Sequence, residues 1–229
     1  MNRKLCFLII FLFFAASLFA VEEERIVVYG EYPVVKELGK GAFEQKEAGG
    51  EHPLINYDGG EGYSGKALME ASHFLSANVY GYTFIYKPGS TLMKTEETFE
   101  VGLRGEAGME NAVVIGEGVR NNIYRVKLGF TITPSVRRWL NAFQTNTIRF
   151  AEAEGTSDFY SGWEGRSDAL REALRNLVLI AAKRSLSSKP LLLKGDILLK
   201  GNPYFSVGAG RHYCKVQGFV NFVEIVTYD

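Results

Sequence analysis

The pattern of apolar and polar positions is the same in each half of this chain: a strand-like segment, then a helical segment, then several strand-like segments. In the first half, a short apolar run at 25–30 is typical of a strand, and apolar residues then recur at three- and four-residue steps over 67–79, the period of a helix. Aromatic and alternating runs follow, and they predict further strands at 80–86, 98–103, 112–115 and 123–133.

The pattern restarts after residue 145, beyond a short helix that Pro134 is expected to open. Residues 147–153 alternate like a strand. The strongest helical pattern of the chain follows, with Ser167 or Asp168 as its expected cap, and it ends before Pro190. Three more strands are predicted at 191–199, 204–207 and 213–226.

Two short motifs link the halves. Residues 67–71 and 169–173 both read A-L-x-E-A, and residues 124–130 and 213–219 both read Y-x4-G-F. Together with the shared order of elements they predict an α+β fold of two related units, each an antiparallel sheet packed by one amphipathic helix. The units are expected at 21–145 and 146–229, and a chance match of short motifs is the alternative.

The N-terminus has the pattern of a secretory signal peptide. Arg3 and Lys4 precede 16 uncharged residues, Leu5 to Ala20, and three glutamates follow from Glu22. We therefore expect residues 1–20 to be removed and the protein to be exported, to the periplasm or the outer envelope. A retained anchor is the alternative, although a span needs about 20 apolar residues.

Charge and cysteine content narrow the class of protein further. The chain has 229 residues, and loss of Arg3 and Lys4 leaves 24 basic against 26 acidic side chains, which argues against a nucleic-acid partner. No later segment is apolar enough to span a bilayer, whereas peripheral membrane association stays open. Cys214 alone remains after cleavage, so no internal disulfide is expected.

The candidate catalytic and metal motifs are incomplete. Residues 60–67 satisfy G-x4-G-K, but Ala67 stands where a phosphate loop needs Ser or Thr, so a helix capped by Ser64 is the preferred interpretation of this end of the Gly-rich loop 39–65. The remaining candidates are only pairs, and a metal site needs three or four ligands. We therefore expect no catalytic, cofactor or metal site; the pairs are His212 with Cys214, Glu70 with His73, and Glu152 with Glu154.

Aromatic side chains alternate along one predicted strand. Tyr80, Tyr82, Phe84 and Tyr86 all point to one face of it. That face is expected to pack in the core beneath a helix, and it would be a partner surface if nothing covered it.

The strand, the A-L-x-E-A helix and the closing tyrosine hairpin resemble the lipoprotein-20-like and FlgT-type envelope domains, most closely over 147–226. The resemblance implies a small non-enzymatic α+β protein used in assembly of the envelope or the flagellar motor, with envelope or flagellar-motor proteins as partners. The chain departs from the pattern in its Gly-rich loop and in lacking a lipid-bearing cysteine at the mature start. The alternatives are a secreted hydrolase, or a module that binds a small ligand or peptidoglycan.

Overall fold

The computed structural model describes residues 24–34, 54–55, 57, 60–90, 94–145, 148–186 and 188–227. The predicted signal peptide, residues 1–20, lies outside the described residues, as does most of the Gly-rich stretch 39–65. The predictions made for those segments therefore stay predictions.

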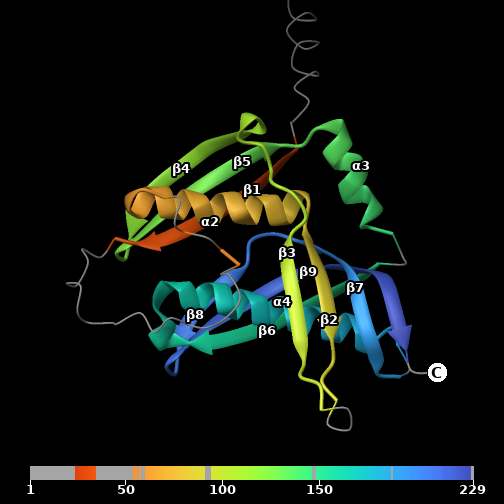
Figure 1. The fold of residues 1–229 in the computed structure, drawn as a ribbon. Helices are drawn as coiled ribbons and strands as arrows, with labels where there is room; N and C mark the ends of the chain where they lie inside the picture. The colour runs from red at the N-terminus through yellow and green to blue at the C-terminus, as the bar shows by residue number, and fades with distance from the viewer. Residues whose placement is uncertain are drawn as a thin grey trace, which may run out of the picture.

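The described residues form three α-helices and two antiparallel sheets, which confirms the α+β class (Figure 1). The smaller sheet has the strand order β1-β5-β4, and the larger has the order β3-β2-β7-β9-β6, with β8 also paired to β9. The helices are α2 (Gly62–Val79), α3 (Pro134–Ala142) and α4 (Gly165–Lys183). The strands are β1 (Arg25–Pro33), β2 (Tyr82–Lys87), β3 (Thr98–Leu103), β4 (Ala112–Arg120), β5 (Ile123–Thr131), β6 (Arg149–Asp158), β7 (Pro190–Leu199), β8 (Tyr204–Gly208) and β9 (Arg211–Thr227).

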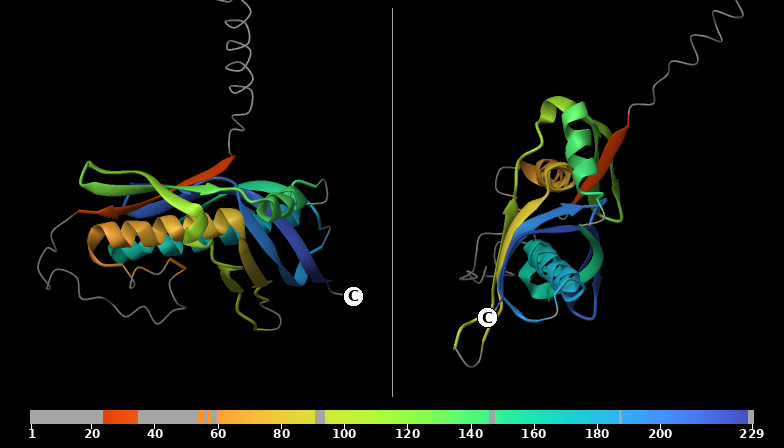
Figure 2. Two further views of the ribbon diagram at one scale, coloured as in Figure 1. Left: turned by 90° about the horizontal axis from the view of Figure 1, so that it is seen from above. Right: turned by 90° about the vertical axis from the view of Figure 1, so that its right-hand side faces the viewer.

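Each long helix covers the first and last strands of its half. Helix α2 packs on β1 and β5, and α4 packs on β6 and β9 (Figures 1 and 2). Glycine makes both approaches close: a Cβ on Gly30 would lie 2.1 Å from the Ala67 carbonyl oxygen, and one on Gly155 would lie 2.4 Å from that of Ala169. The two A-L-x-E-A motifs therefore supply the same kind of contact, a fully buried alanine against a strand glycine.

The boundary between the two sheets does not coincide with the boundary that the sequence predicts between the two units. Strands β2 and β3 precede the predicted boundary at residues 145 and 146, yet β2 pairs with β7 along residues 82–86. The β2–β3 hairpin therefore extends the larger sheet, and only β1, β4 and β5 remain in the smaller one. One continuous hydrophobic core contains residues from both sheets and both long helices.

The alternating aromatic residues of β2 lie in this core rather than on the surface. Tyr82, Phe84 and Tyr86 are 0%, 2% and 6% exposed. The prediction for Tyr80 was wrong, because this residue caps the C-terminus of α2 and precedes β2, and it is partly buried. The Tyr82 hydroxyl lies 2.8 Å from His73 Nε2 of α2. The alternative of an exposed partner surface at these residues is corrected, because packing within the chain covers that face.

Two helices begin earlier than the capping residues suggested. Helix α4 starts at Gly165, so Ser167 lies inside it and its hydroxyl accepts a hydrogen bond from the Ile55 amide at 3.0 Å. Helix α2 starts at Gly62 after Glu61, which leaves Ser64 exposed in the first turn and not at the cap. Helix α3 starts at Pro134 as predicted.

Strand β4 is longer than its apolar run indicated. It continues to Arg120 through Gly116 and Gly118, two residues that usually weaken strands. A two-residue loop, Asn121-Asn122, then leads into β5, and both asparagines have positive φ angles of 52° and 59°. Positive φ at both positions is what the tight hairpin turn requires, and asparagine tolerates it well.

Candidate interaction surface

A buried ion pair joins the two long helices. Glu70 of α2 is fully buried, and Arg166 of α4 is 6% exposed. The Arg166 Nη2 lies 3.1 Å from Glu70 Oε1, and its Nη1 lies 3.5 Å from Glu31 Oε2 on β1. The guanidinium also lies over the rings of Trp163 and Phe205, at 4.3 Å and 4.0 Å from their centres.

The Glu70 carboxylate is satisfied on both oxygens. The Tyr57 hydroxyl donates to Oε1 at 2.9 Å, and the Glu31 amide donates to Oε2. Burial raises the pKa of Glu70 above its usual range, while the Arg166 guanidinium acts in the opposite direction. Both charged groups are buried and have hydrogen-bond or ion-pair partners within the chain. We therefore interpret the pair as a contact between the two helices and not as a substrate site.

The other side chains considered from the sequence are also engaged within the fold. Lys66 Nζ donates to the Tyr32 hydroxyl at 3.2 Å, and Gly60 packs directly against Gly65, so residues 60–67 close on themselves. His73 is paired with Tyr82 and not with Glu70, and burial lowers its pKa to about 4. No larger metal-ligating group is found among the residues that the structure describes.

The remaining two pairs behave differently from each other. His212 and Cys214 are both buried on β9, and burial raises the pKa of the Cys214 thiol. The exposed Glu152 forms an ion pair with Lys215 on the neighbouring strand, and Glu154 lies 4.0 Å from the same ammonium group. None of the described helices is long and apolar enough to cross a membrane.

The outer face of the three-stranded sheet is the exception to this pattern. Alternation along β5 places Val126, Leu128 and Phe130 in the core beneath α2, and it places Arg125 and Lys127 on the opposite, exposed face. We call this second face the outer face of β1-β5-β4. Helix α2 packs on the opposite side of the sheet, and Leu140 of α3 lines a separate groove together with Val27 near the start of β1.

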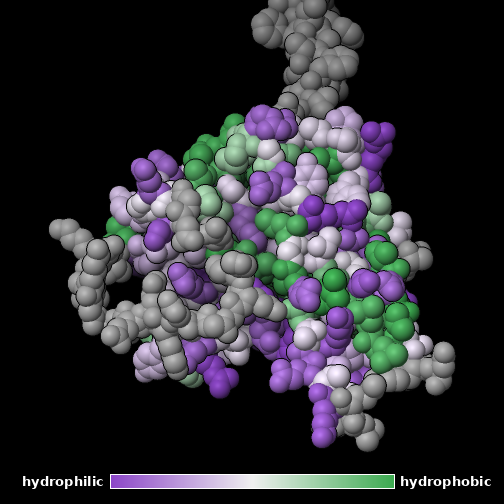
Figure 3. All heavy atoms as spheres, in the orientation of Figure 1, coloured by the Kyte–Doolittle hydropathy of each residue, from purple (hydrophilic) through white to green (hydrophobic). Residues whose placement is uncertain are grey.

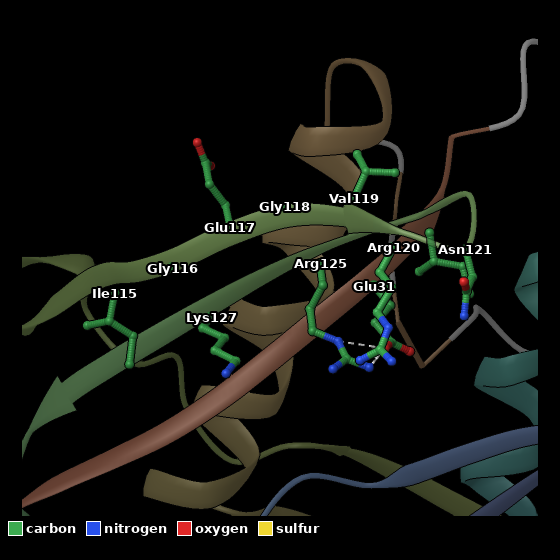
Figure 4. Close-up of a pocket in the computed structure, with 11 residues that line it drawn as sticks. Glu31, Ile115, Gly116, Glu117, Gly118, Val119, Arg120, Asn121, Arg125 and Lys127 are labelled. Carbon is green, nitrogen blue, oxygen red and sulfur yellow. Dashed lines mark hydrogen bonds and ion pairs between the residues drawn. The ribbon is translucent and has the colours of Figure 1, made fainter.

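A groove of about 590 Å³ runs along the outer face. Figure 4 shows Lys127, Arg125, Arg120 and Asn121 on one side of the β4–β5 hairpin, with Glu117 and Val119 directed to the other. Arg125 pairs with Glu31 and lies 4.6 Å from the centre of the Tyr29 ring. Arg120 and Lys127 have no ion pair with any described residue, so their charges are available to a partner.

Aliphatic side chains continue the outer face beyond the basic groove. Val27 and Val113 flank Gly129 on the neighbouring strands, and Ile115 lies against the same glycine. Val27 is 51% exposed, Val113 53% and Ile115 46%. Apolar side chains also gather over β4 on the side toward α2, which is the side that faces the viewer in the space-filling view (Figure 3). A face with adjoining basic and aliphatic parts suits binding better than chemistry, since the Glu31 carboxylate that lines it is held in ion pairs with Arg125 and Arg166.

Sequence reasoning did not single out this face. The sequence does contain an alternating run, Arg125-Val126-Lys127-Leu128. This run indicates a strand with two basic residues on one side and apolar residues on the other. The sequence pattern did not show that Arg120 of β4 lies beside Arg125 and Lys127 of β5, because that position depends on the hairpin turn at Asn121-Asn122. That turn is a recognisable hairpin signal.

Comparison with known proteins places the chain in a family without adding an activity. Neither the curated proteins nor the solved structures include a match to it. The model of one protein family, an uncharacterised one, matches residues 25–228. Because this match spans nearly the whole chain, the protein belongs to that family.

Proposed function

We propose that this protein is a non-catalytic, exported envelope protein that acts by binding another protein. The observation that carries the proposal is the outer face of β1-β5-β4, where Arg120 and Lys127, which have no ion pair with a described residue, lie beside exposed aliphatic residues. An assembly role in the envelope or flagellar motor, with partners from those structures, is the role that the resemblance to FlgT-type domains implies. The N-terminal signal pattern supports export.

The buried charges support the same proposal by contrast. Glu70, Arg166 and His73 each have partners within the fold, so their role is to stabilise the folded chain. On the outer face, by contrast, Arg120 and Lys127 have no ion pair with a described residue, and α2 covers only the opposite side of the sheet. Exposed apolar area next to unpaired charge is characteristic of surfaces that bind partners.

The proposal is tested by quantitative affinity capture from envelope extracts with three forms of the tagged full chain. The first is the wild type, and the second is the outer-face variant R120E/K127E. The third is the control K87E/R211E, which makes the same change of net charge at exposed strand positions that do not line the groove. The proposal expects a stoichiometric partner with the wild type and the control, and its loss with the outer-face variant.

Two results would count against the proposal. One is that no protein is retained in stoichiometric amount by any form. The other is that the same proteins are retained by the wild type and the outer-face variant, which would place binding elsewhere on the molecule. Circular dichroism of the variants establishes that each one is folded before the capture is interpreted.

A small-ligand module is the second candidate, and a separate groove favours it. This groove, also about 590 Å³, lies between β1, α3 and the larger sheet, and most of its lining is apolar. The volume of this groove and its mostly apolar lining are typical of sites that bind small ligands. Leu140→Gln should weaken binding of a fluorescent apolar probe such as ANS if the groove is a ligand site; unchanged probe binding would reject it. The lining includes Ile26, Val27, Leu140, Leu198, Leu199 and Phe219.

We also propose that the halves arose from one unit by duplication. The order β1-β5-β4 with α2 matches the order β6-β9-β8 with α4, and Gly30 and Gly155 make equivalent contacts with buried alanines. The Y-x4-G-F motifs fit this match less well. Gly30 is paired with Val126 and Gly155 with Cys214, which shifts the motifs by one residue. Alignment of the two halves across family members would test the duplication, and absence of similarity would reject it.

A further inference from the structure

We infer that β4 accepts an extended segment of the partner protein as an added strand, and that this segment carries glutamate side chains on the outer face. The inference rests on the proposed function and names the kind of partner that the outer face fits. It depends on three features of the described residues: an open strand edge, a path without side chains across β4, and free basic groups at the end of that path.

The edge of β4 is open, whereas the corresponding edge of β1 is closed. At β1, the Asn202 side chain donates to the Tyr29 carbonyl and accepts from the Tyr29 amide, both at 2.9 Å. The next outward amide, that of Glu31, is bonded to the Glu70 carboxylate. Among the described residues β4 pairs only with β5, so its other edge has unpaired backbone donors and acceptors.

Few of the usual protections against strand addition are present on β4. The strand reads Ala-Val-Val-Ile-Gly-Glu-Gly-Val-Arg and contains neither lysine nor proline. Val114 and Val119 are 52% and 56% exposed, so the side of β4 toward α2 is open as well. One irregularity, between Val114 and Gly116, bends the strand, and it lies at the junction of the aliphatic and basic parts.

Glycines make a path across β4 to the basic groups of β5. Gly116 is paired with Lys127 and Gly118 with Arg125, and a Cβ at either glycine would meet no atom within 4 Å. Neighbouring strands are about 4.8 Å apart, so the added strand would lie roughly 10 Å from β5. A long acidic side chain can bridge that distance to a lysine or arginine only where β4 has no side chain between them.

The order of side chains along the added segment follows from these positions. Glutamates are expected at two alternate positions, beside Gly116 and Gly118, where they would meet Lys127, Arg125 and the adjacent Arg120. An aliphatic residue is expected farther along the same face, beside Val113 and Ile115. Lys127 and Arg120 are the main charge partners, because Arg125 already pairs with Glu31.

Synthetic peptides test the inference directly with the full chain. The probe is a fluorescein-labelled nine-residue peptide with glutamate at two successive alternate positions, valine at the next two, and threonine between them. Its control has lysine in place of both glutamates. We expect the glutamate peptide to bind at least about tenfold more tightly in fluorescence anisotropy, and R120E/K127E to reverse the preference. The K87E/R211E control should leave the preference unchanged.

Two changes separate strand addition from simple charge attraction. Methylation of the amide nitrogens at one alternate set of peptide positions should abolish binding, and methylation at the other set should not, because an edge strand uses alternate amides. Gly118→Thr should weaken binding of the glutamate peptide severalfold, since it obstructs the path in a place where the fold has room for a side chain.

Equal binding of the glutamate and lysine peptides would overturn the inference, as would equal tolerance of methylation at both sets of positions. The proposed function has a separate readout. If R120E/K127E still loses a stoichiometric partner while the peptides show no preference, the outer face binds by another geometry and only the added strand is rejected. If capture is unaffected as well, both proposals fail.

Discussion

Charged residues have opposite roles at two places in this molecule. At the junction of α2 and α4, Glu70 and Arg166 are almost without exposure, and each is surrounded by partners. On the outer face of β1-β5-β4, Arg120 and Lys127 are exposed and have no ion pair with described residues. The difference separates charges that the fold needs from charges that are available for binding.

The contrast extends to the glycines of the two regions. Gly30 and Gly155 are necessary for packing, because a Cβ there would collide with helix backbone. Gly116 and Gly118 have open space around them, so packing does not explain them. Glycines without a packing role, in a strand that they weaken, are a reason to attribute function to the outer face.

Loss of the buried arginine should have the largest effect on stability. Arg166→Met leaves the Glu70 carboxylate buried without its counter-ion, and we expect the free energy of unfolding at pH 7 to fall by about 3–5 kcal/mol. Urea denaturation measures this. The double variant E70M/R166M should recover part of the loss. A single variant as stable as the wild type would contradict the role given to the pair.

Protonation of His73 should produce the next largest effect. Its pKa is lowered from 6.5 to about 4 in the fold, so the unfolded chain binds the proton more strongly between those values. Stability is therefore retained above pH 6.5 and lost as the pH falls toward 4, by up to about 3 kcal/mol for this group. His73→Gln should flatten that part of the stability profile, measured by urea denaturation at several pH values; an unchanged profile would assign the dependence to other groups.

Single glycine substitutions compare the packed strands with the outer face. Gly30→Ala and Gly155→Ala should each reduce the free energy of unfolding by about 1–3 kcal/mol or more, because the added methyl group meets helix backbone. Gly118→Ala, in open space, should change it by less than about 0.5 kcal/mol. Thermal and urea unfolding of the three variants measure the difference. Equal costs at all three positions would show that the packing contrast is mistaken.

The outer-face charges should have the smallest effect on stability. The R120E/K127E variant breaks no ion pair with a described residue, so its free energy of unfolding should stay within about 0.5 kcal/mol of the wild type. Urea denaturation beside Arg166→Met gives the comparison. A loss of several kcal/mol would mean that these residues support the fold, and their availability for a partner would then need another explanation.

The sequence predicted local elements better than their pairing. Periodicity identified β3 at its observed bounds and placed α2, α4 and most strands, because the apolar positions of 98–103 and of the helices follow a single period. It could not show that the β2–β3 hairpin joins the sheet of the second half, since strand pairing is set by contacts distant in the sequence. The A-L-x-E-A motif was noticed, but its glycine partners are 37 and 14 residues away.

The site was harder to predict than the fold. The aromatic residues of β2 alternate along the strand, and such alternation is typical both of an exposed binding face and of the buried face that the structure shows. Glu70 was considered with its helical neighbour His73, whereas its partners are Arg166 and Tyr57 from other segments. The outer face combines side chains of three strands, and only the strand register brings Arg120 beside Arg125 and Lys127.

Site-specific photo-crosslinking in cells that produce the protein tests whether the outer face of β1-β5-β4 binds a partner protein. A benzoylphenylalanine at Val113 reports on the outer face, and the same residue at Val223, which is 70% exposed on β9, is the control. We expect one cross-linked product of defined mass from position 113 and none from position 223. No product from position 113, or the same products from both positions, would contradict this expectation.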